Sequence, residues 1–559
     1  MNALASVKRR KKLSVQYLTW YIHSLFGLKL SLLLSVVLIS GGLAVVDREI
    51  DWLIYPEMRA KEQLDQIPLN PGEVADKLKA YDPSLSVYYI RTFPGQPYMA
   101  TLVDIDRPDG SWALLWLNPY TAEIQGELDI QSPGHFLSQL HGNLFLPYGR
   151  MIVNFTGVLV LVGLITGLIA FPKFWRYFFR PPRTGNMRVF LGDLHKLVGL
   201  WSLWIVLFIG VSGTWWFYQY PLVTDLSAPN LLKNTRPSKP ILTHEQMAET
   251  PDFKSGAELF RAVQTAYPNI TFTTFSPPEH NSEPYTFRGL AGEWLVTNWA
   301  SNKIYVNPYT AEVVLADKIT DVSGGQRVDM ALSSLHYGNW GYGSADLPVK
   351  IAWSIGGLAM GFLSISGMLI YYKRARKAGK KLKKYAFAGK YIPQLNTAEG
   401  QRKWRILRPW GGPMGNLKYL NIALMVGIVI GIPSFFEATP PEIGHKYPEQ
   451  ALGPWKISAF ASANDEDTPP IVAGTNATLK VNIPYEAYKN IKFIYARVNK
   501  PRRLRAPGAL IHGMVGVKHV HLPIPKRAKP GSELWITAET WDGQFYQTHW
   551  PLFPDQLEQ

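Results

Sequence analysis

Four of the twelve histidines in this chain occupy positions that correspond in pairs. His23 begins the segment HSLFGL and His195 begins the similar segment HKLVGL, while His141 lies in LHGN and His336 lies in LHYGN. A neutral imidazole nitrogen is a common ligand for iron, zinc and copper. These four residues are therefore the candidates for binding a metal or a cofactor. The segments that contain them indicate which of these they bind.

The matched histidines lie in or beside long apolar segments. Residues 151–171, 197–218 and 351–372 contain no charged side chain, residues 18–46 contain only Lys29, and residues 417–436 contain only Lys418. About 20 apolar residues are enough for a helix to cross the hydrocarbon core of a bilayer. The sequence predicts five membrane-spanning helices, and we expect the first to be a retained anchor because no A-x-A cleavage site precedes Asp47.

Basic residues are concentrated in three short segments. Residues 1–12, 171–190 and 372–415 carry five, five and thirteen Lys or Arg residues, with Glu399 as their one acidic residue. The net charge of the whole chain is +16, so the remainder is negative. Because positive loops stay in the cytoplasm, we expect a multi-pass protein of the bacterial inner membrane with a cytoplasmic N-terminus and a periplasmic C-terminus. The same pattern removes nucleic acid as a partner.

Several other motifs repeat with the histidines. Ser40-Gly41 and Ser212-Gly213 follow His23 and His195 at the same distance, and Thr166-Gly167 returns as Ser366-Gly367. The hexapeptide NPYTAE occurs at 118–123 and again at 307–312, where we expect a structural turn. These repeats predict a duplicated unit of helix, outer domain and helix.

Each outer domain is expected to contain one amphipathic helix followed by strands. The helices are predicted at 69–83 and 255–268. The strands are predicted at 86–93, 98–106, 111–118, 271–277, 284–290, 293–299 and 302–307.

A duplicated helical core would bring the matched histidines together in two pairs. His23 and His195 would meet near the cytoplasmic face, and His141 and His336 near the outer face. Two neutral imidazoles on opposite sides of an iron hold a b-type haem. The chain has no cysteine, which excludes Fe–S clusters and covalently attached haem, and zinc prefers three or four protein ligands. We therefore predict two bis-histidine b-type haems.

The alternative is that these histidines are polar residues at helix ends, kept in register by the duplication. Gly27 and Gly199 lie four residues after a histidine, so they leave room either for a porphyrin edge or for a close helix.

The order of the motifs resembles a known family over roughly residues 15–375. The H-x-x-x-G-L helices, the L-H-(x)-G-N segments and the NPYTAE turns are similar to those of the PepSY-associated transmembrane helix proteins. The resemblance implies two periplasmic PepSY domains and a four-helix core. Its siderophore-reductase-like branch implies an inner haem on His23 and His195, an outer haem on His141 and His336, and electron transfer outward to a ferric chelate.

The C-terminal segment departs from the short members of that family. Alternating strands such as ATLKVNIP, IKFIYARVN and KHVHLPIP predict an immunoglobulin-like β-sandwich. His519 and His521 share one face of a strand, and His512 and His549 can approach them, so a metal site competes with the commoner case of exposed strand histidines.

The predicted architecture is an α+β membrane protein in which a duplicated helix–PepSY–helix unit forms a four-helix transmembrane core, followed by a fifth transmembrane helix and an outer β-sandwich. The order along the chain is a cytoplasmic N-terminus (1–17), helix 1 (18–46), PepSY-like domain 1 (47–140), helix 2 with its outer end (141–171), a cytoplasmic loop (172–190), helix 3 (191–218), PepSY-like domain 2 (219–335), helix 4 with its outer end (336–372), a basic cytoplasmic loop (373–415), helix 5 (416–436) and the sandwich (437–559).

The expected function is a transmembrane haem-dependent reductase of a ferric siderophore or other ferric chelate. No dinucleotide-binding or P-loop motif occurs, so electrons must come from quinol or from a separate cytosolic reductase. The basic segment 373–408 fits a docking site for a donor or for anionic membrane lipid, or a determinant of topology alone. Two alternatives stay open: a quinone-linked haem b oxidoreductase with another acceptor, and a haem-free protein whose PepSY domains bind or inhibit a partner.

Overall fold

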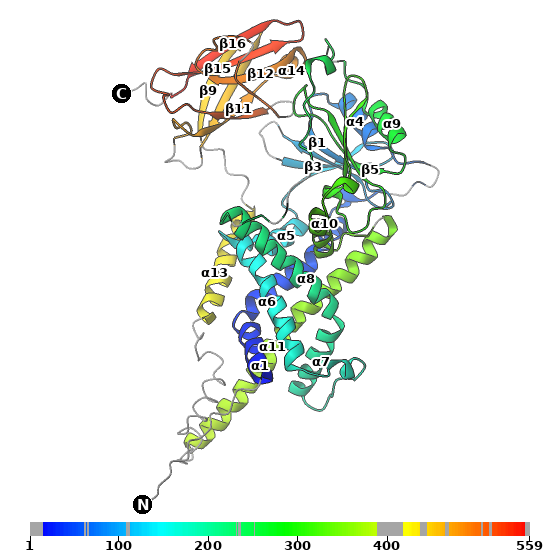
Figure 1. Cartoon of the computed structure of the whole chain (residues 1–559), viewed down its shortest axis with the longest axis vertical. Helices are drawn as coiled ribbons and strands as arrows, with labels where there is room; N and C mark the ends of the chain where they lie inside the picture. Colours follow the sequence, from blue (N-terminus) through cyan, green and yellow to red (C-terminus); the bar gives the residue numbers. More distant parts are fainter. Residues whose placement is uncertain are drawn as a thin grey trace, which may run out of the picture. The chain divides into compact units, whose positions relative to one another are not determined.

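The chain forms two compact units, described here from a computed structural model (Figure 1). The structure describes residues 15–387, 417–436 and 444–553, apart from gaps at 61–62, 64–65, 108–111, 228, 231, 233–235, 251, 342, 464–468, 505–506 and 514–516. The helical unit comprises residues 1–51, 131–233 and 328–436, and the β-rich unit comprises 52–130, 234–327 and 437–559. Most of the predicted cytoplasmic segments 1–17 and 373–415 lie outside the described residues.

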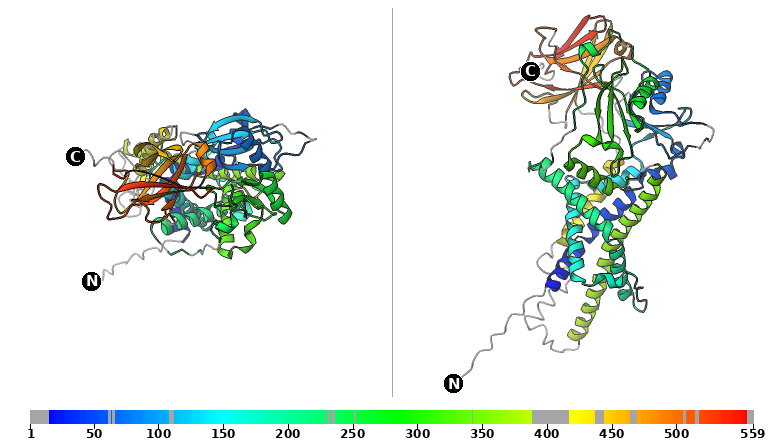
Figure 2. Two further views of the ribbon diagram at one scale, coloured as in Figure 1. Left: turned by 90° about the horizontal axis from the view of Figure 1, so that it is seen from above. Right: turned by 45° about the vertical axis from the view of Figure 1, so that its right-hand side comes forward.

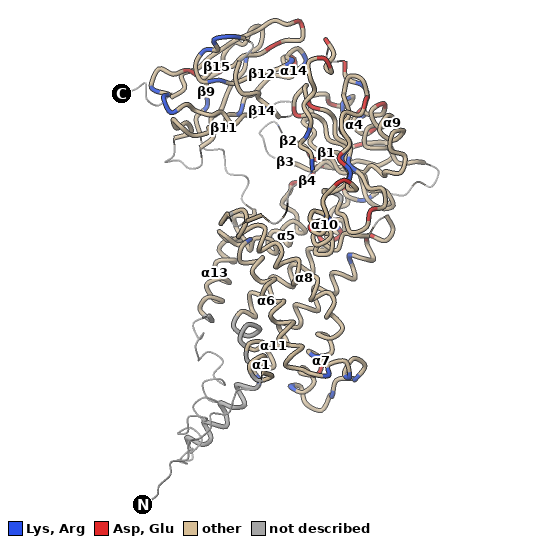
Figure 3. Tube along the Cα trace, viewed as in Figure 1, with Lys and Arg blue, Asp and Glu red and all other residues tan. Residues whose placement is uncertain are grey.

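Helices of the helical unit have the length and composition of membrane spans. Three are long and apolar enough by themselves, at Gly149–Ala170, Gly343–Ile370 and Tyr419–Phe436, and two bent pairs would raise the number to five. They correspond to α6 (Gly149–Ala170), to η7 (Gly343–Ala345) with α11 (Asp346–Phe387), and to α13 (Leu417–Phe436). Charged residues are nearly absent along α6 and along α8 (Leu203–Phe217), as Figure 3 shows. The chain is therefore a membrane protein.

The first and third predicted spans are broken helices. The first divides at Leu30 into α1 (Val15–Lys29) and α2 (Ser31–Ala44), and α3 (Asp47–Ile54) then leaves α2 at 65°. The third divides at Ser202 into α7 (Met187–Trp201) and α8, which are bent by 68°. The Ser202 hydroxyl donates to the Val198 carbonyl at 2.7 Å, a bond that competes with the backbone ladder and bends helices.

The second and fourth spans each follow a separate short helix. The helix α5 (Pro133–Asn143) precedes α6, and α10 (Gly324–Tyr337) precedes α11. Three residues with left-handed backbone, Leu144, Phe145 and Tyr148, turn the chain between α5 and α6. Gly338, at a φ of 65°, turns it after α10.

Glycines allow the long helices to approach closely. A Cβ on Gly42 of α2 would lie 3.0 Å from the Gly357 carbonyl carbon of α11. A Cβ on Gly157 of α6 would lie 2.5 Å from the Gly213 carbonyl carbon of α8. Small residues at such contacts are typical of packed membrane helices.

One continuous antiparallel sheet joins the two predicted outer domains. Its strand order is β4-β3-β2-β1-β5-β6-β7-β8, and β1 pairs with β5 through Ile90 with Phe275 and Arg91 with Thr274. Reading outward from this central pair gives the same succession of strands on both sides. The strands are β1 (Ser86–Arg91), β2 (Thr101–Asp106), β3 (Trp112–Leu117), β4 (Ile124–Asp129), β5 (Thr271–Ser276), β6 (Tyr285–Leu290), β7 (Asn302–Val306) and β8 (Val313–Asp317).

Two helices cover one face of this sheet, α4 (Pro71–Tyr81) and α9 (Gly256–Ala266) (Figures 1 and 2). Their N-termini touch, because a Cβ on Gly72 would lie 2.1 Å from the Gly256 carbonyl oxygen. Val74 and Leu259 are fully buried against alternate residues of the strands, such as Ile90 and Phe287. The amphipathic helices predicted from the sequence therefore supply the core of the sheet.

The two NPYTAE turns have the same geometry. Asn118 N–H donates to the Glu123 carbonyl at 2.9 Å, and Asn307 N–H donates to the Glu312 carbonyl at 2.9 Å. Each asparagine side chain accepts from the backbone N–H two residues later, also at 2.9 Å. These bonds close the β3–β4 and β7–β8 hairpins, so the turn has the structural role that was expected.

The strand predicted at 293–299 is wrong. The segment instead contains a turn and the short helix η5 (Asn298–Ala300), because β6 pairs directly with β7 and leaves no place between them. Leu295 has a φ of 56°, which an extended strand does not allow. Strands β4 and β8 were not predicted from the sequence.

The C-terminal segment forms two four-stranded sheets around one apolar core. Their orders are β14-β11-β10-β9 and β13-β12-β15-β16, and Ile457, Leu479, Ile536 and Trp550 are among the residues buried between them. The strands are β9 (Gly444–Leu452), β10 (Trp455–Ser462), β11 (Asn476–Asn482), β12 (Ile491–Val498), β13 (Ala509–Leu510), β14 (Val517–Pro523), β15 (Glu533–Thr540) and β16 (Phe545–Pro551), with the helix α14 (Tyr485–Asn490) before β12. The remaining short helices are η1 (Pro56–Met58), η2 (Phe174–Tyr177), η3 (Tyr218–Asp225), η4 (His244–Gln246) and η6 (Ile319–Asp321).

Candidate functional site

The structure brings the four predicted histidines together in two pairs. The ring centroids of His23 on α1 and His195 on α7 are 6.5 Å apart, and their ring planes are 83° apart. The ring centroids of His141 on α5 and His336 on α10 are 6.0 Å apart, with an angle of 35° between the planes. The pairs therefore consist of the same residues that the sequence repeat matches.

The two pairs lie at different levels of the helical unit. His23 bonds to Gly163 late in α6, whereas His141 belongs to the short helix that precedes α6. The contact of His141 on α2 is Val37, which follows His23 by 14 residues. At 1.5 Å per helical residue this corresponds to about 20 Å along the first span, or less because of the break at Leu30.

Each imidazole has its Nδ1 atom in a hydrogen bond to a neighbouring helix, and His23 Nδ1 also lies 3.4 Å from Thr166 Oγ1. His23 Nδ1 lies 2.9 Å from the Gly163 carbonyl oxygen, and His141 Nδ1 lies 2.9 Å from the Val37 carbonyl oxygen. A carbonyl oxygen only accepts, so Nδ1 carries the proton in both rings.

Serine hydroxyls are the hydrogen-bond partners of Nδ1 in the other two rings. His195 Nδ1 lies 2.8 Å from Ser366 Oγ, and His336 Nδ1 lies 2.8 Å from Ser212 Oγ. Ser366 already donates to the Leu363 carbonyl and Ser212 to the Phe208 carbonyl, so each hydroxyl accepts from the imidazole.

The four Nδ1 bonds leave the four Nε2 atoms as free lone-pair donors. A neutral imidazole with a proton on Nδ1 carries its lone pair on Nε2. Among the described residues no hydrogen bond reaches any of these Nε2 atoms. Metal-binding histidines characteristically donate their other N–H to a carbonyl or another acceptor in this way.

The separations within the pairs fit two imidazoles on opposite sides of one metal. A metal–imidazole bond is about 2 Å long and each ring centroid lies about 1 Å behind its nitrogen, which gives centroids about 6 Å apart. The distances of 6.5 and 6.0 Å agree with this value. Within the described chain no group of three or more His, Asp or Glu side chains could hold a metal ion. Two protein ligands per site suit haem, whose porphyrin supplies the remaining four.

Small residues that mark the sequence repeat surround the rings. A Cβ on Gly41 would lie 2.6 Å from His141 Cε1, one on Gly167 would lie 3.2 Å from His23 Cε1, and one on Gly367 would lie 3.6 Å from His195 Cε1. The sequence analysis identified these positions only as repeats. Their spacing from the histidines was the available sign that they line the sites.

The sequence predicted that Gly27 and Gly199 leave room either for a porphyrin edge or for a close helix. A Cβ on Gly199 would contact Leu363 at 3.6 Å, which is ordinary helix packing. The surroundings of Gly27 lie outside the described residues. Gly163, beside His23, faces open space instead.

The C-terminal histidines do not form one cluster. The rings of His512 and His519 are 4.2 Å apart and those of His519 and His521 are 6.1 Å apart. His549 lies on the other sheet, stacked on Trp535 at 4.6 Å. The candidate metal site with His549 is therefore not assembled.

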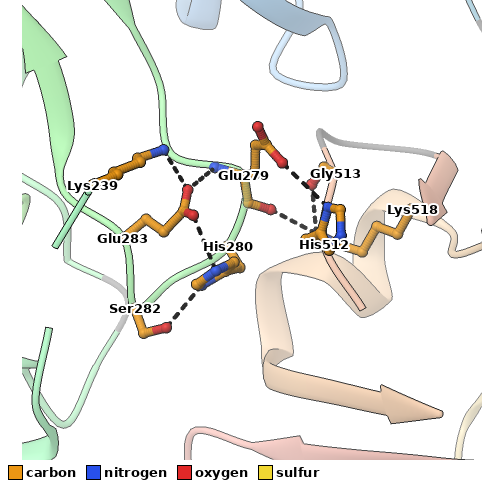
Figure 4. Close-up of polar contacts among 8 residues, drawn as sticks. All are labelled: Lys239, Glu279, His280, Ser282, Glu283, His512, Gly513 and Lys518. Atoms are coloured by element: carbon orange, nitrogen blue, oxygen red, sulfur yellow. Dashed lines mark hydrogen bonds and ion pairs between the residues drawn. The ribbon is translucent and has the colours of Figure 1, made fainter. Parts of the chain in front are cut away.

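His512 instead belongs to a joint between the sandwich and the second half of the large sheet (Figure 4). Its Nδ1 lies 3.3 Å from Glu279 Oε2, and this contact lowers the pKa of Glu279. The ammonium group of Lys518 donates to the carbonyls of Gly513 and Glu279, at 2.9 and 3.4 Å, and burial lowers its pKa to about 8. We interpret this joint as structural.

Comparisons with known proteins agree with this organisation. The model of the PepSY-associated TM region matches residues 20–374. A second family model, described as Uncharacterised conserved protein UCP029505, matches residues 418–553, which include α13 and the sandwich. The chain is also similar to "Uncharacterized protein PA4219" of Pseudomonas aeruginosa, at 38% identity over 79 residues. That match covers 14% of this chain and only 20% of the relative.

The match to the PepSY-associated TM region covers more than half of the chain, including both histidine pairs and the whole eight-stranded sheet. The chain thus belongs to the PepSY-associated transmembrane family.

Proposed function

We propose that this protein is a di-haem b oxidoreductase that moves electrons across the bacterial inner membrane to a ferric chelate outside, with a ferric siderophore as the leading case. The observation that carries the proposal is the pairing of four imidazoles whose Nδ1 atoms are held and whose Nε2 atoms are free. A b-type haem bound at each pair would supply a reversible one-electron couple.

Both imidazoles of each pair would bind the iron, and each ring is held by a different kind of hydrogen-bond partner. In each pair one imidazole is fixed by a backbone carbonyl and the other by a serine hydroxyl. These bonds fix the tautomer, hold the ring orientation and increase the basicity of Nε2. The apolar helices around the pairs exclude water, which limits side reactions at the iron.

The two levels of the pairs support a transmembrane route. A haem at one pair alone would lie in one part of the bilayer. Haems at both pairs would divide the distance of about 30 Å across the hydrocarbon layer into shorter electron-transfer steps. The positive segments at 1–12, 171–190 and 372–415 orient His23 and His195 toward the cytoplasm. Electrons would enter there from a cytosolic reductase, or from quinol within the lipid, and leave at His141 and His336.

A difference spectrum of histidine variants tests the proposal. We expect the purified protein to show two b-type components, one lost in both His23→Ala and His195→Ala, the other in both His141→Ala and His336→Ala. His549→Ala is the matched control, since His549 lies outside both pairs. Loss of one common component in His23→Ala and His141→Ala, with the other intact, would disprove the pairing. A purified protein without haem would favour a partner-binding role of the PepSY domains.

Transport of electrons is tested in liposomes with a reductant inside and a ferric chelate outside. Ferrous iron should appear outside with the wild-type protein and should not appear with His23→Ala or His336→Ala. Unchanged reduction after loss of either haem would refute the transmembrane route and favour a quinone-linked reaction.

A further inference from the structure

The face of the eight-stranded sheet opposite α4 and α9 carries a row of aromatic and guanidinium groups. Tyr89 and Arg91 alternate with the core residue Ile90, so they point to this face. Arg288 alternates with the core residue Phe287, and Trp112 alternates in the same way with Ala113. The row therefore runs across β3, β1 and β6.

The members of the row are in contact with one another. The Trp112 and Tyr88 rings are 5.4 Å apart, and the Tyr88 and Tyr89 rings stack at 6.4 Å. The guanidinium carbons of Arg288 and Arg91 lie 5.4 and 5.8 Å from the Tyr89 ring centroid. Trp112 is 55% exposed, so one end of the row is open to solvent.

Carboxylates among the described residues balance only part of the positive charge beside the row. Arg91 pairs with Asp104, Arg236 pairs with Asp317, and Asp106 is hydrogen-bonded by Tyr88. Arg288, in contrast, has no hydrogen-bond or ion-pair partner within the described residues, and its Nε atom is buried.

Lys303 adds a second positive charge to this face. It lies on β7, which pairs with β6 so that Lys303 is opposite Arg288. The described residues offer Lys303 no ion pair either. Burial lowers its pKa, and the neighbouring Arg236 and Arg288 lower it further, whereas Asp317, opposite Lys303 on β8, acts in the other direction.

We propose that this row binds the ferric chelate as a negatively charged complex with aromatic donor groups, of the catecholate type. The proposal rests on the proposed function and names the substrate class for it. Flat anionic rings can stack on Tyr89 and Trp112 while their oxygens accept from Arg288, which combines aromatic stacking with charge-assisted hydrogen bonds. An uncharged chelate can form only the stacking contacts.

Binding can be tested without electron transfer by using gallium(III), which takes the place of iron(III) but is not reduced. The probe is the gallium complex of a linked tris-catecholate, titrated into the full-length protein in detergent. The comparison probe is an uncharged gallium tris-hydroxamate. Arg288→Gln should weaken binding of the anionic complex about tenfold, because a hydrogen bond to a charged group is lost. Tyr89→Leu should weaken it several-fold, and added salt should weaken it further.

Arg261→Gln is the matched control, because Arg261 is an exposed residue of α9 on the opposite face of the sheet. The affinity of Arg261→Gln for the anionic gallium complex should stay within about twofold of that of the wild-type protein. Equal affinity for the uncharged complex, or equal affinities of Arg288→Gln and Arg261→Gln, would overturn the proposed site. Binding of the chelate without any reduction of its ferric form would refute the proposed function and leave the site standing. Undiminished binding and reduction in Arg288→Gln would refute the proposed site and leave the proposed function standing.

Discussion

Ser212→Ala should weaken binding of the proposed outer haem and leave binding of the proposed inner haem unchanged. The Ser212 hydroxyl accepts from His336 Nδ1 at 2.8 Å, and within the described part of the chain it is the only side chain that is hydrogen-bonded to this ring. Loss of such a partner typically lowers metal affinity by about 10- to 100-fold, or about 1.4 to 2.7 kcal/mol. The effect should be smaller than that of His336→Ala, because the ligand itself remains.

The repeat supplies a matched control for this experiment. Ser40 is the counterpart of Ser212, but its hydroxyl donates to the carbonyls of Val36 and Val37, and among the described residues it makes no hydrogen bond to an imidazole. The Val37 carbonyl also accepts from His141, and that bond remains in Ser40→Ala. Haem content of each purified variant would be measured by pyridine haemochrome and by titration of the apo-protein with haem. We expect reduced affinity at one site in Ser212→Ala and wild-type behaviour in Ser40→Ala. Equal effects of the two variants, or a loss at both sites, would refute the assignment of the Ser212 bond.

The surroundings of Gly41 and of Glu283 and the distribution of basic residues each give a testable expectation. Gly41→Ala should lower occupancy of the outer site alone, because the new Cβ lies 2.6 Å from His141 Cε1, and haem content per site would show it. Burial raises the pKa of Glu283, but hydrogen bonds from His280 and Lys239 outweigh it and lower the pKa to about 2. Glu283 therefore stabilises the β-rich unit above pH 4.5, by at most about 3 kcal/mol, and loses this effect as the pH falls toward 2. Glu283→Gln should flatten the acid limb of the unfolding curve, and an unchanged curve would contradict it. A reporter active only in the cytoplasm should be silent at the carboxyl terminus and active at the amino terminus.

The sequence repeat was sufficient to predict which histidines pair. His23 and His195 have the same distance to their small residues, and a duplicated helix must carry matched residues to matched depths. The hydrogen-bond partners could not be predicted in this way. Whether Ser212 faces a ring and Ser40 faces its own helix depends on the rotation of each helix, which the apolar pattern of a membrane helix does not specify.

The sequence predicted most elements of the outer part but not how its halves join. Period-two patterns identified six of the eight strands of the large sheet, including β1 and β5. They contain no information about pairing between β1 and β5, because any two edge strands offer the same backbone groups. The bend at Ser202 was not predicted either, because no proline marks it and Gly199, three residues before it, was interpreted only as room for a porphyrin edge or a close helix.

Electron paramagnetic resonance of the oxidised, purified protein tests the central claim most directly. In low-spin ferric haem the anisotropy of the signal reports the angle between the two axial imidazole planes. The planes are 83° apart for His23 and His195 and 35° apart for His141 and His336. We expect two low-spin signals, a highly anisotropic one that disappears in His195→Ala and a rhombic one that disappears in His336→Ala. A protein with no low-spin ferric signal, or with one signal that survives both substitutions, would contradict the central claim.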